Sequence, residues 1–100
     1  MNRLLLIACI AERDVLRYTP AGIPIVSARL AHSSEQVEAG IQRQLEFDIA
    51  AIAAGDISGK FDRAELGVPF RFEGFLARKS RNSKSLVFHV TGFEACSPDH

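Results

Sequence analysis

The chain gathers four positively charged side chains into the seven residues 78–84, whose sequence is RKSRNSK. These cations are Arg78, Lys79, Arg81 and Lys84. No acidic residue lies between them, so no neighbour in the sequence neutralises their charge. The serines and the asparagine of the stretch add short hydrogen-bond donors, which suit phosphate oxygens. Two interpretations fit this composition: a solvated hairpin tip, or a site that binds an anion.

The charge of the whole chain does not indicate a general polyanion binder. Twelve Lys and Arg are balanced by twelve Asp and Glu, so the formal net charge is zero. Any binding to a polyanion must therefore come from local charge asymmetry. Near-zero net charge also weakens self-repulsion, which favours self-association.

Length and composition predict one folded domain spanning residues 1–100. With 47% hydrophobic and 24% charged residues, the chain can bury one core but not two. Residues 4–11 form an apolar run that is too short to cross a membrane. This run is better interpreted as a core strand than as a signal peptide. We therefore expect a cytoplasmic protein without a membrane partner.

The residue types that would indicate catalysis or a metal centre are scattered. The three histidines lie far apart, and Cys9 and Cys96 form no C-x-x-C pair, so they are expected to be reduced rather than to bind a metal. The chain has no glycine-rich phosphate loop and no nucleophile elbow. Glu46 and Asp48 share one strand face and are interpreted as solvated. We predict a protein that is not an enzyme and holds no cofactor.

The hydrophobic pattern predicts five strands. Polar residues 32–40 are interpreted as a long hairpin loop, and residues 50–66 as a connector with one helical turn. Gly74 interrupts the fourth strand, where we expect a bulge or a tight bend. Residues 96–100 are expected to form a frayed tail. The predicted strands cover residues 4–10, 23–30, 42–49, 68–77 and 86–91.

Five strands with a connector after the third predict an all-β OB-fold, a small Greek-key barrel. A five-stranded SH3-like barrel fits the strand count almost as well, but the position of the connector favours the OB-fold. Oligonucleotides bind OB-folds at the loop between the first two strands and the loop between the last two. The basic stretch 78–84 occupies the second of these loops. Arg17 and Tyr18 lie in the first, where Tyr18 is able to stack on a base.

Most of the other aromatic side chains are expected in the core. Alternation in the third strand places Leu45, Phe47 and Ile49 on the buried face. Phe75 and Phe93 break the alternation of their strands and are candidates for exposure. Single-strand binding uses aromatic platforms, so these two residues and Tyr18 are the aromatic candidates.

Several short segments resemble the primosomal replication protein N (PriB) family, which is related to single-stranded DNA-binding protein. The segments occur in matching order over nearly the whole chain. They are NRL (2–4), LRYTPAGIP (16–24), EAGIQRQ (38–44), EGFLARKSRNSKS (73–85) and GFE (92–94).

The resemblance implies an OB-fold homodimer that binds single-stranded DNA and has no catalytic activity. It also implies a scaffold between the restart helicase and the next primosome protein. Family cations that contact DNA match Arg17 in the first loop, and match Lys79, Arg81 and Lys84, beside Arg78, in the basic loop. We expect binding to single-stranded DNA or RNA with little sequence preference.

One position departs from the family pattern. Some members have a stacking tryptophan where this chain has Glu46, and a carboxylate there repels phosphate. Binding is therefore expected to depend more on cations than on stacking. The competing hypothesis is a protein-interaction module whose basic loop binds an acidic partner.

Overall fold

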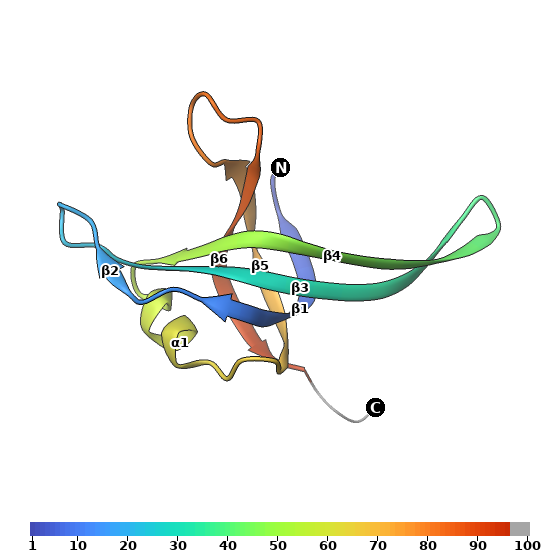
Figure 1. Ribbon diagram of the computed structural model, residues 1–100, viewed down its shortest axis with the longest axis horizontal. Helices are drawn as coiled ribbons and strands as arrows, with labels where there is room; N and C mark the ends of the chain where they lie inside the picture. The colour runs from blue at the N-terminus through green and yellow to red at the C-terminus, as the bar shows by residue number, and fades with distance from the viewer. Residues whose placement is uncertain (97–100) are drawn as a thin grey trace.

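The computed structural model describes residues 1–96, which form six strands and one short helix (Figure 1). Of the predicted tail, residues 97–100 lie outside the described residues. The elements are β1 (Leu4–Arg13), β2 (Arg17–Tyr18), β3 (Pro24–Glu38), β4 (Ile41–Ala54), α1 (Ile57–Arg63), β5 (Pro69–Arg78) and β6 (Leu86–Ala95).

Five of the strands close into a barrel. The sheet order is β1-β5-β6-β4-β3-β2, and an additional β1–β3 pairing closes it. β1 contributes to both ends of this order because its first half, Leu4 to Cys9, pairs with β5, and its second half, Cys9 to Arg13, pairs with β3. β4 and β6 run parallel, and the two-residue β2 extends the sheet beside β3. The predicted five-stranded OB-fold barrel is confirmed.

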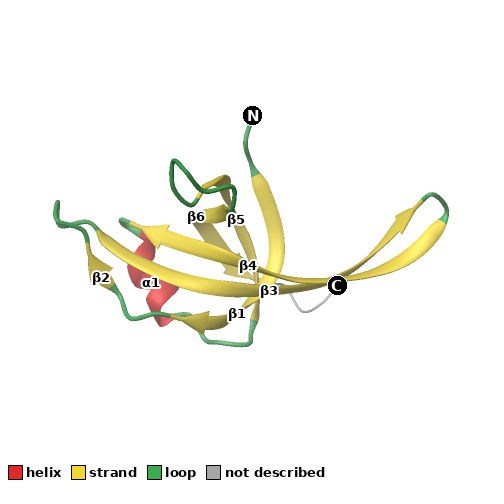
Figure 2. Cartoon of the chain, turned by 45° about the horizontal axis from the view of Figure 1, so that its top comes forward, coloured by secondary structure: helices red, strands yellow, loops and turns green. Residues whose placement is uncertain are grey.

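The helix closes one end of the barrel (Figure 2). Its Phe61 is fully buried and contacts the rings of Phe72 and Phe93 edge-on, at centroid distances of 6.1 and 5.8 Å. Arg13 donates hydrogen bonds to the carbonyl oxygens of Phe61 and Ala64, which satisfies the carboxyl end of the helix. The core is therefore built from inward-facing strand residues and this helical plug: Ile10, Val26, Leu30, Phe61, Phe72 and Phe88 are the largest fully buried side chains.

No helix in residues 1–96 combines the length and the hydrophobicity needed to cross a membrane. α1 has seven residues, where the sequence predicted a single turn within residues 50–66. β4 extends to Ala54 and so takes up the first part of this predicted connector. The alanine-rich segment fits a strand here because Ala51 and Ala53 are buried in the core of the barrel.

A bulge between β5 and β6 reverses which side chains of β6 face the core. The register shifts between Glu73 and Gly74, where Thr91 is the extra residue on β6, which confirms the predicted irregularity at Gly74. A Cβ atom at Gly74 would lie 1.8 Å from the His89 carbonyl oxygen, so only glycine fits this close approach. On β5, which has no extra residue, alternation places Gly74 inward and Phe75 outward. Phe93, a candidate for exposure from the sequence, is buried, because the extra residue on β6 turns it inward.

The predicted loop at residues 32–40 is instead the end of a long two-stranded arm. β3 and β4 stay paired up to Glu38 and Ile41, and only Ala39 and Gly40 form the turn. Both turn residues have positive φ, 54° and 75°, as a two-residue hairpin turn requires. The arm extends away from the barrel (Figure 1), so both of its faces meet solvent and its sequence lacks apolar alternation. This absence of a buried face made a strand look like a loop.

The arm also explains why Phe47 is not buried. Phe47 pairs with His32 on the same face as Leu30, as alternation predicts. However, the barrel no longer lies beneath the sheet at this point, so Phe47 is 43% exposed. Its ring packs against the His32 ring at 4.8 Å instead of entering the core.

Candidate nucleic-acid interface

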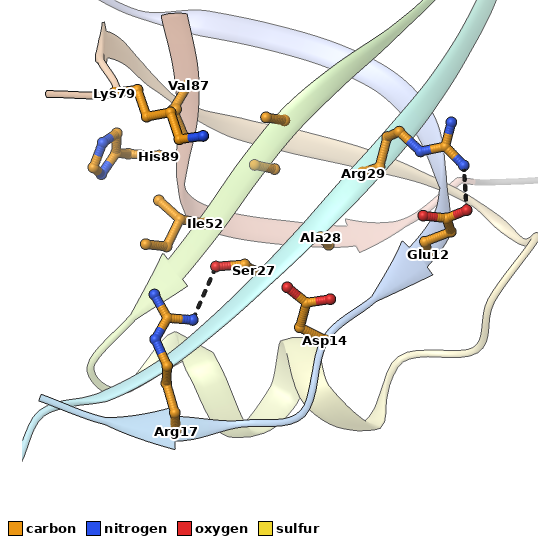
Figure 3. A pocket seen from close by; sticks show the side chains of 12 residues that line it. Glu12, Asp14, Arg17, Ser27, Ala28, Arg29, Ile52, Lys79, Val87 and His89 are labelled. Atoms are coloured by element: carbon orange, nitrogen blue, oxygen red, sulfur yellow. Dashed lines mark hydrogen bonds and ion pairs between the residues drawn. The ribbon is translucent and has the colours of Figure 1, made fainter. Parts of the chain in front are cut away.

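A groove of about 530 Å³ lies on the outer face of the barrel (Figure 3). Its floor is formed by outward-facing residues of β3, β4 and β6. Arg17 of β2 lines it, as does Lys79 at the start of the β5–β6 loop. The structure thus brings together the two loops that the sequence predicted to bind an oligonucleotide, although 62 positions separate these two cations.

One row of paired residues crosses the floor of this groove. His89 of β6 pairs with Ile52 of β4, and Ile52 pairs with Ser27 of β3. Arg17 then donates a hydrogen bond from Nη1 to Ser27 Oγ at 3.1 Å. Because directly paired residues point to the same face of a sheet, these side chains form a continuous strip from β6 to β2.

The four cations of the basic loop are all exposed. Only Lys79 lines the groove, and its backbone N–H bonds to the Ser85 carbonyl, which closes the loop. Arg78 donates to the carbonyl oxygen of Arg81, so its guanidinium supports the loop backbone. Within residues 1–96, no loop cation has a carboxylate within ion-pair distance, whereas Arg3, Arg29, Arg43 and Arg71 are each paired. The loop therefore presents charge that the protein does not neutralise.

Tyr18 is placed differently from its neighbour Arg17. Both belong to β2, where successive side chains point to opposite faces, and Tyr18 does not line the groove. Its ring is exposed beside the groove. A contact between Tyr18 and a base therefore stays a prediction.

The groove also contains acidic residues that the sequence did not reveal as part of the site. Arg29 is held between Glu12 and Asp48, with nitrogen–oxygen distances of 2.6 Å to each, so two carboxylates balance its charge. Asp14 lines the groove as well (Figure 3). Positive charge thus gathers on the side of Arg17 and Lys79, and negative charge on the side of β1.

Sequence reasoning missed several groove residues. Ser27, Arg29, Ile52 and His89 carry no motif, and they line the groove only because their strands are adjacent in the barrel. Strand alternation did place His89 opposite the buried Phe88, and this was the one available signal.

The described residues contain no arrangement suited to a metal ion. Within residues 1–96, no three His, Cys, Asp or Glu side chains are grouped as a ligand set. Cys9 and Cys96 are both free thiols.

Comparison with known proteins places the chain in a family. A family described as "another single-strand binding protein family" matches residues 2–92. Replication restart protein PriB of Nitrosomonas europaea is 42% identical over 89 residues, which cover 89% of this chain and 82% of that protein. The solved structure of PriB from Ralstonia solanacearum has a TM-score of 0.87 and 47% identity, and covers 95% of this chain and 97% of its own.

A deletion mutant of the single-stranded DNA-binding protein of Thermus aquaticus shares the fold. Its TM-score is 0.75 at 21% identity, and the match covers 98% of this chain and 51% of that chain. The family match defines the class as single-strand binding proteins. Within that class, the chain belongs to the PriB family.

Proposed function

We propose that the protein binds single-stranded DNA, or RNA, with little sequence preference as a non-enzymatic accessory factor of replication restart in the cytoplasm. The proposal includes a scaffold role between the restart helicase and the downstream primosome proteins. The observation that carries it is the convergence of Arg17 and Lys79 on one groove, next to a loop whose cations have no carboxylate partner among residues 1–96. The names of the relatives, replication restart protein PriB, support the pathway.

The groove suits a single strand better than a rigid duplex. Phosphate contacts supply most non-specific affinity, and the cations lie along the rim while the floor contains small and apolar side chains such as Ser27 and Ile52. Such a floor does not read base edges, which is why we propose little sequence preference.

We further propose that the protein acts as a homodimer. The edge of β1 over Leu4–Ala8 that faces away from β5 has no strand partner among residues 1–96. Leu5 and Ile7 on this segment are 53% and 50% exposed. An unpaired apolar edge is a template for pairing with a second chain.

Fluorescence anisotropy with labelled oligo-dT and with a duplex of equal length tests the proposed function. We expect oligo-dT to bind more tightly than the duplex. If four phosphates are neutralised per protomer, log K should fall against log salt with a slope of roughly −3. Affinity for oligo-dT that does not change with salt would contradict the proposal.

The alternative function is an OB-fold protein-interaction module whose basic loop binds an acidic partner. Asp14 in the groove favours it, because its carboxylate repels a phosphate backbone that runs through the groove, whereas an acidic partner needs to contact only the basic loop. Failure of both oligo-dT and duplex to bind at low salt would support this alternative.

A further inference from the structure

An aromatic pair lies on the same face of the sheet as the groove. It stands at the β6 end of the strip of side chains that crosses the groove floor. Phe75 of β5 pairs directly with His89 of β6, and the two rings stack at a centroid distance of 4.8 Å with an interplanar angle of 7°. Phe75 is 38% exposed. Extended through this pair, the strip runs from Phe75 through His89, Ile52 and Ser27 to Arg17.

Strand alternation on β5 and the bulge on β6 together place this pair on the outer face. β5 alternates regularly, so the buried Phe72 places Gly74 inward and Phe75 outward. The extra residue Thr91 lies on β6 and brings His89 opposite Phe75. Gly74 then lets the β5 backbone approach the His89 carbonyl closely, which holds the two strands together beside the rings. The backbone geometry of β5 and β6 therefore holds the Phe75 ring on the outer face.

The pair is also close to the positive charge of the site. His89 and Lys79 line the same groove, and Phe75 and Lys79 are four residues apart, about 13 Å along an extended chain. Lys79 follows directly after β5 and lines the same groove as His89, on whose ring Phe75 stacks, so the ring and the ammonium group lie at the same groove. A base on the ring and a nearby phosphate on the lysine can thus be held together.

We propose that Phe75, backed by His89, is a stacking platform for one nucleobase of the bound strand. The proposal deepens the proposed function and rests on it. Bases stack on aromatic faces without sequence preference, and the His89 ring holds the Phe75 ring upright, so little side-chain freedom is lost on binding. The platform would supply the stacking contact that Glu46 cannot make on the arm.

A single-tryptophan variant tests the contact directly, because the chain contains no tryptophan. We expect oligo-dT to quench the fluorescence of Phe75→Trp. An abasic oligomer of the same length, which keeps the phosphates but lacks the bases, should bind without quenching. The matched control is Phe47→Trp, an exposed ring on the opposite face of the sheet, whose emission should not respond to either oligomer.

Affinity gives a second, independent measurement. Stacking contributes about 1–3 kcal/mol per base, so Phe75→Leu should weaken oligo-dT binding about fivefold or more. Binding of the abasic oligomer should be unchanged, and a urea titration should show that the variant is folded.

The outcomes separate the platform from the proposed function. If wild-type protein binds oligo-dT but Phe75→Trp is not quenched and Phe75→Leu binds normally, the platform is overturned and the proposed function stands. If wild-type protein binds no single strand at low salt, both are overturned.

Discussion

Arg29 and Lys79 line the same groove, yet their charges serve different purposes. Arg29 is held between two carboxylates at 2.6 Å each, so it joins β3 to β1 and β4 and has little charge left for a ligand. Lys79 has no carboxylate within ion-pair distance in residues 1–96, and it projects from a loop. At the scale of single residues, the pairing of a cation decides whether it can bind phosphate.

Removing the charge of the loop should remove most of the binding. In a variant with Lys79, Arg81 and Lys84 all changed to alanine, three phosphate contacts are lost. The salt slope should then shrink by about 2, and the affinity for oligo-dT should fall at least about tenfold. The side chains are exposed and unpaired, so the free energy of unfolding should change by less than about 0.5 kcal/mol. Anisotropy titrations and urea denaturation measure the two effects.

The control for this variant removes the same charge elsewhere. Arg3, Arg63 and Arg71 lie outside the groove, and replacing all three by alanine should leave the salt slope near its wild-type value. Equal losses of affinity in both triple variants would mean that net charge, rather than the loop, drives binding.

At the scale of elements, two hairpins extend from the barrel with opposite charge (Figure 1). All charged residues of the β5–β6 loop are cations. The outward face of the β3–β4 arm carries Glu35, Glu46 and Asp48, which share a strand face with the groove. A negatively charged strand should therefore lie along the β5–β6 loop and avoid the arm.

Neutralising the arm should strengthen binding modestly. Glu46→Gln keeps the size and exposure of the side chain and removes one negative charge. Exposed charge interactions contribute about 0.2–1 kcal/mol, so the affinity for oligo-dT should rise by a factor of about 1.4 to 5. Anisotropy at low salt measures the change, since salt screens it.

Glu65→Gln is the matched control for the arm, because Glu65 is also exposed but lies in the loop after α1. It should leave the affinity nearly unchanged. A decrease in affinity on Glu46→Gln would show that the strand does not avoid the arm.

At the scale of the whole molecule, one edge of β1 over Leu4–Ala8 has no strand partner among residues 1–96. β1 bends between its two pairings, with a register shift between Ile10 and Glu12, so its first half separates from β3. His32 donates a hydrogen bond to the Ile7 carbonyl and covers only part of this edge. A second copy that pairs there would bury Leu5 and Ile7.

A charge on this edge should separate the two protomers. Light scattering should give twice the chain mass of 11.0 kDa for the wild-type protein and 11.0 kDa for Ile7→Glu. The physical reason is the cost of burying an unpaired carboxylate in an apolar interface. Leu66→Glu, at a residue of similar exposure outside β1, should remain dimeric. A wild-type mass of 11.0 kDa at micromolar concentration would refute the dimer.

The sequence by itself determined the strands with a buried face and the composition of the basic loop. Residues 4–10, 23–30 and 86–91 alternate or run apolar because one side of each packs in the core, so the pattern records the fold. The glycine at position 74 likewise marked the bulge. Where no face is buried, as in the arm, the sequence shows no apolar alternation. Residues 32–40, predicted as a loop, therefore belong to a strand pair and its turn.

Only the tertiary structure decided which side chains form the groove and which rings are exposed. Ser27, Ile52 and His89 meet because strands distant in sequence become neighbours when the barrel closes. Phe47 is exposed because the barrel ends beneath it, and Phe93 is buried because one extra residue reverses its strand. Alternation gives the face of each residue relative to its neighbours. Whether that face meets the core or solvent depends on what the chain packs against it.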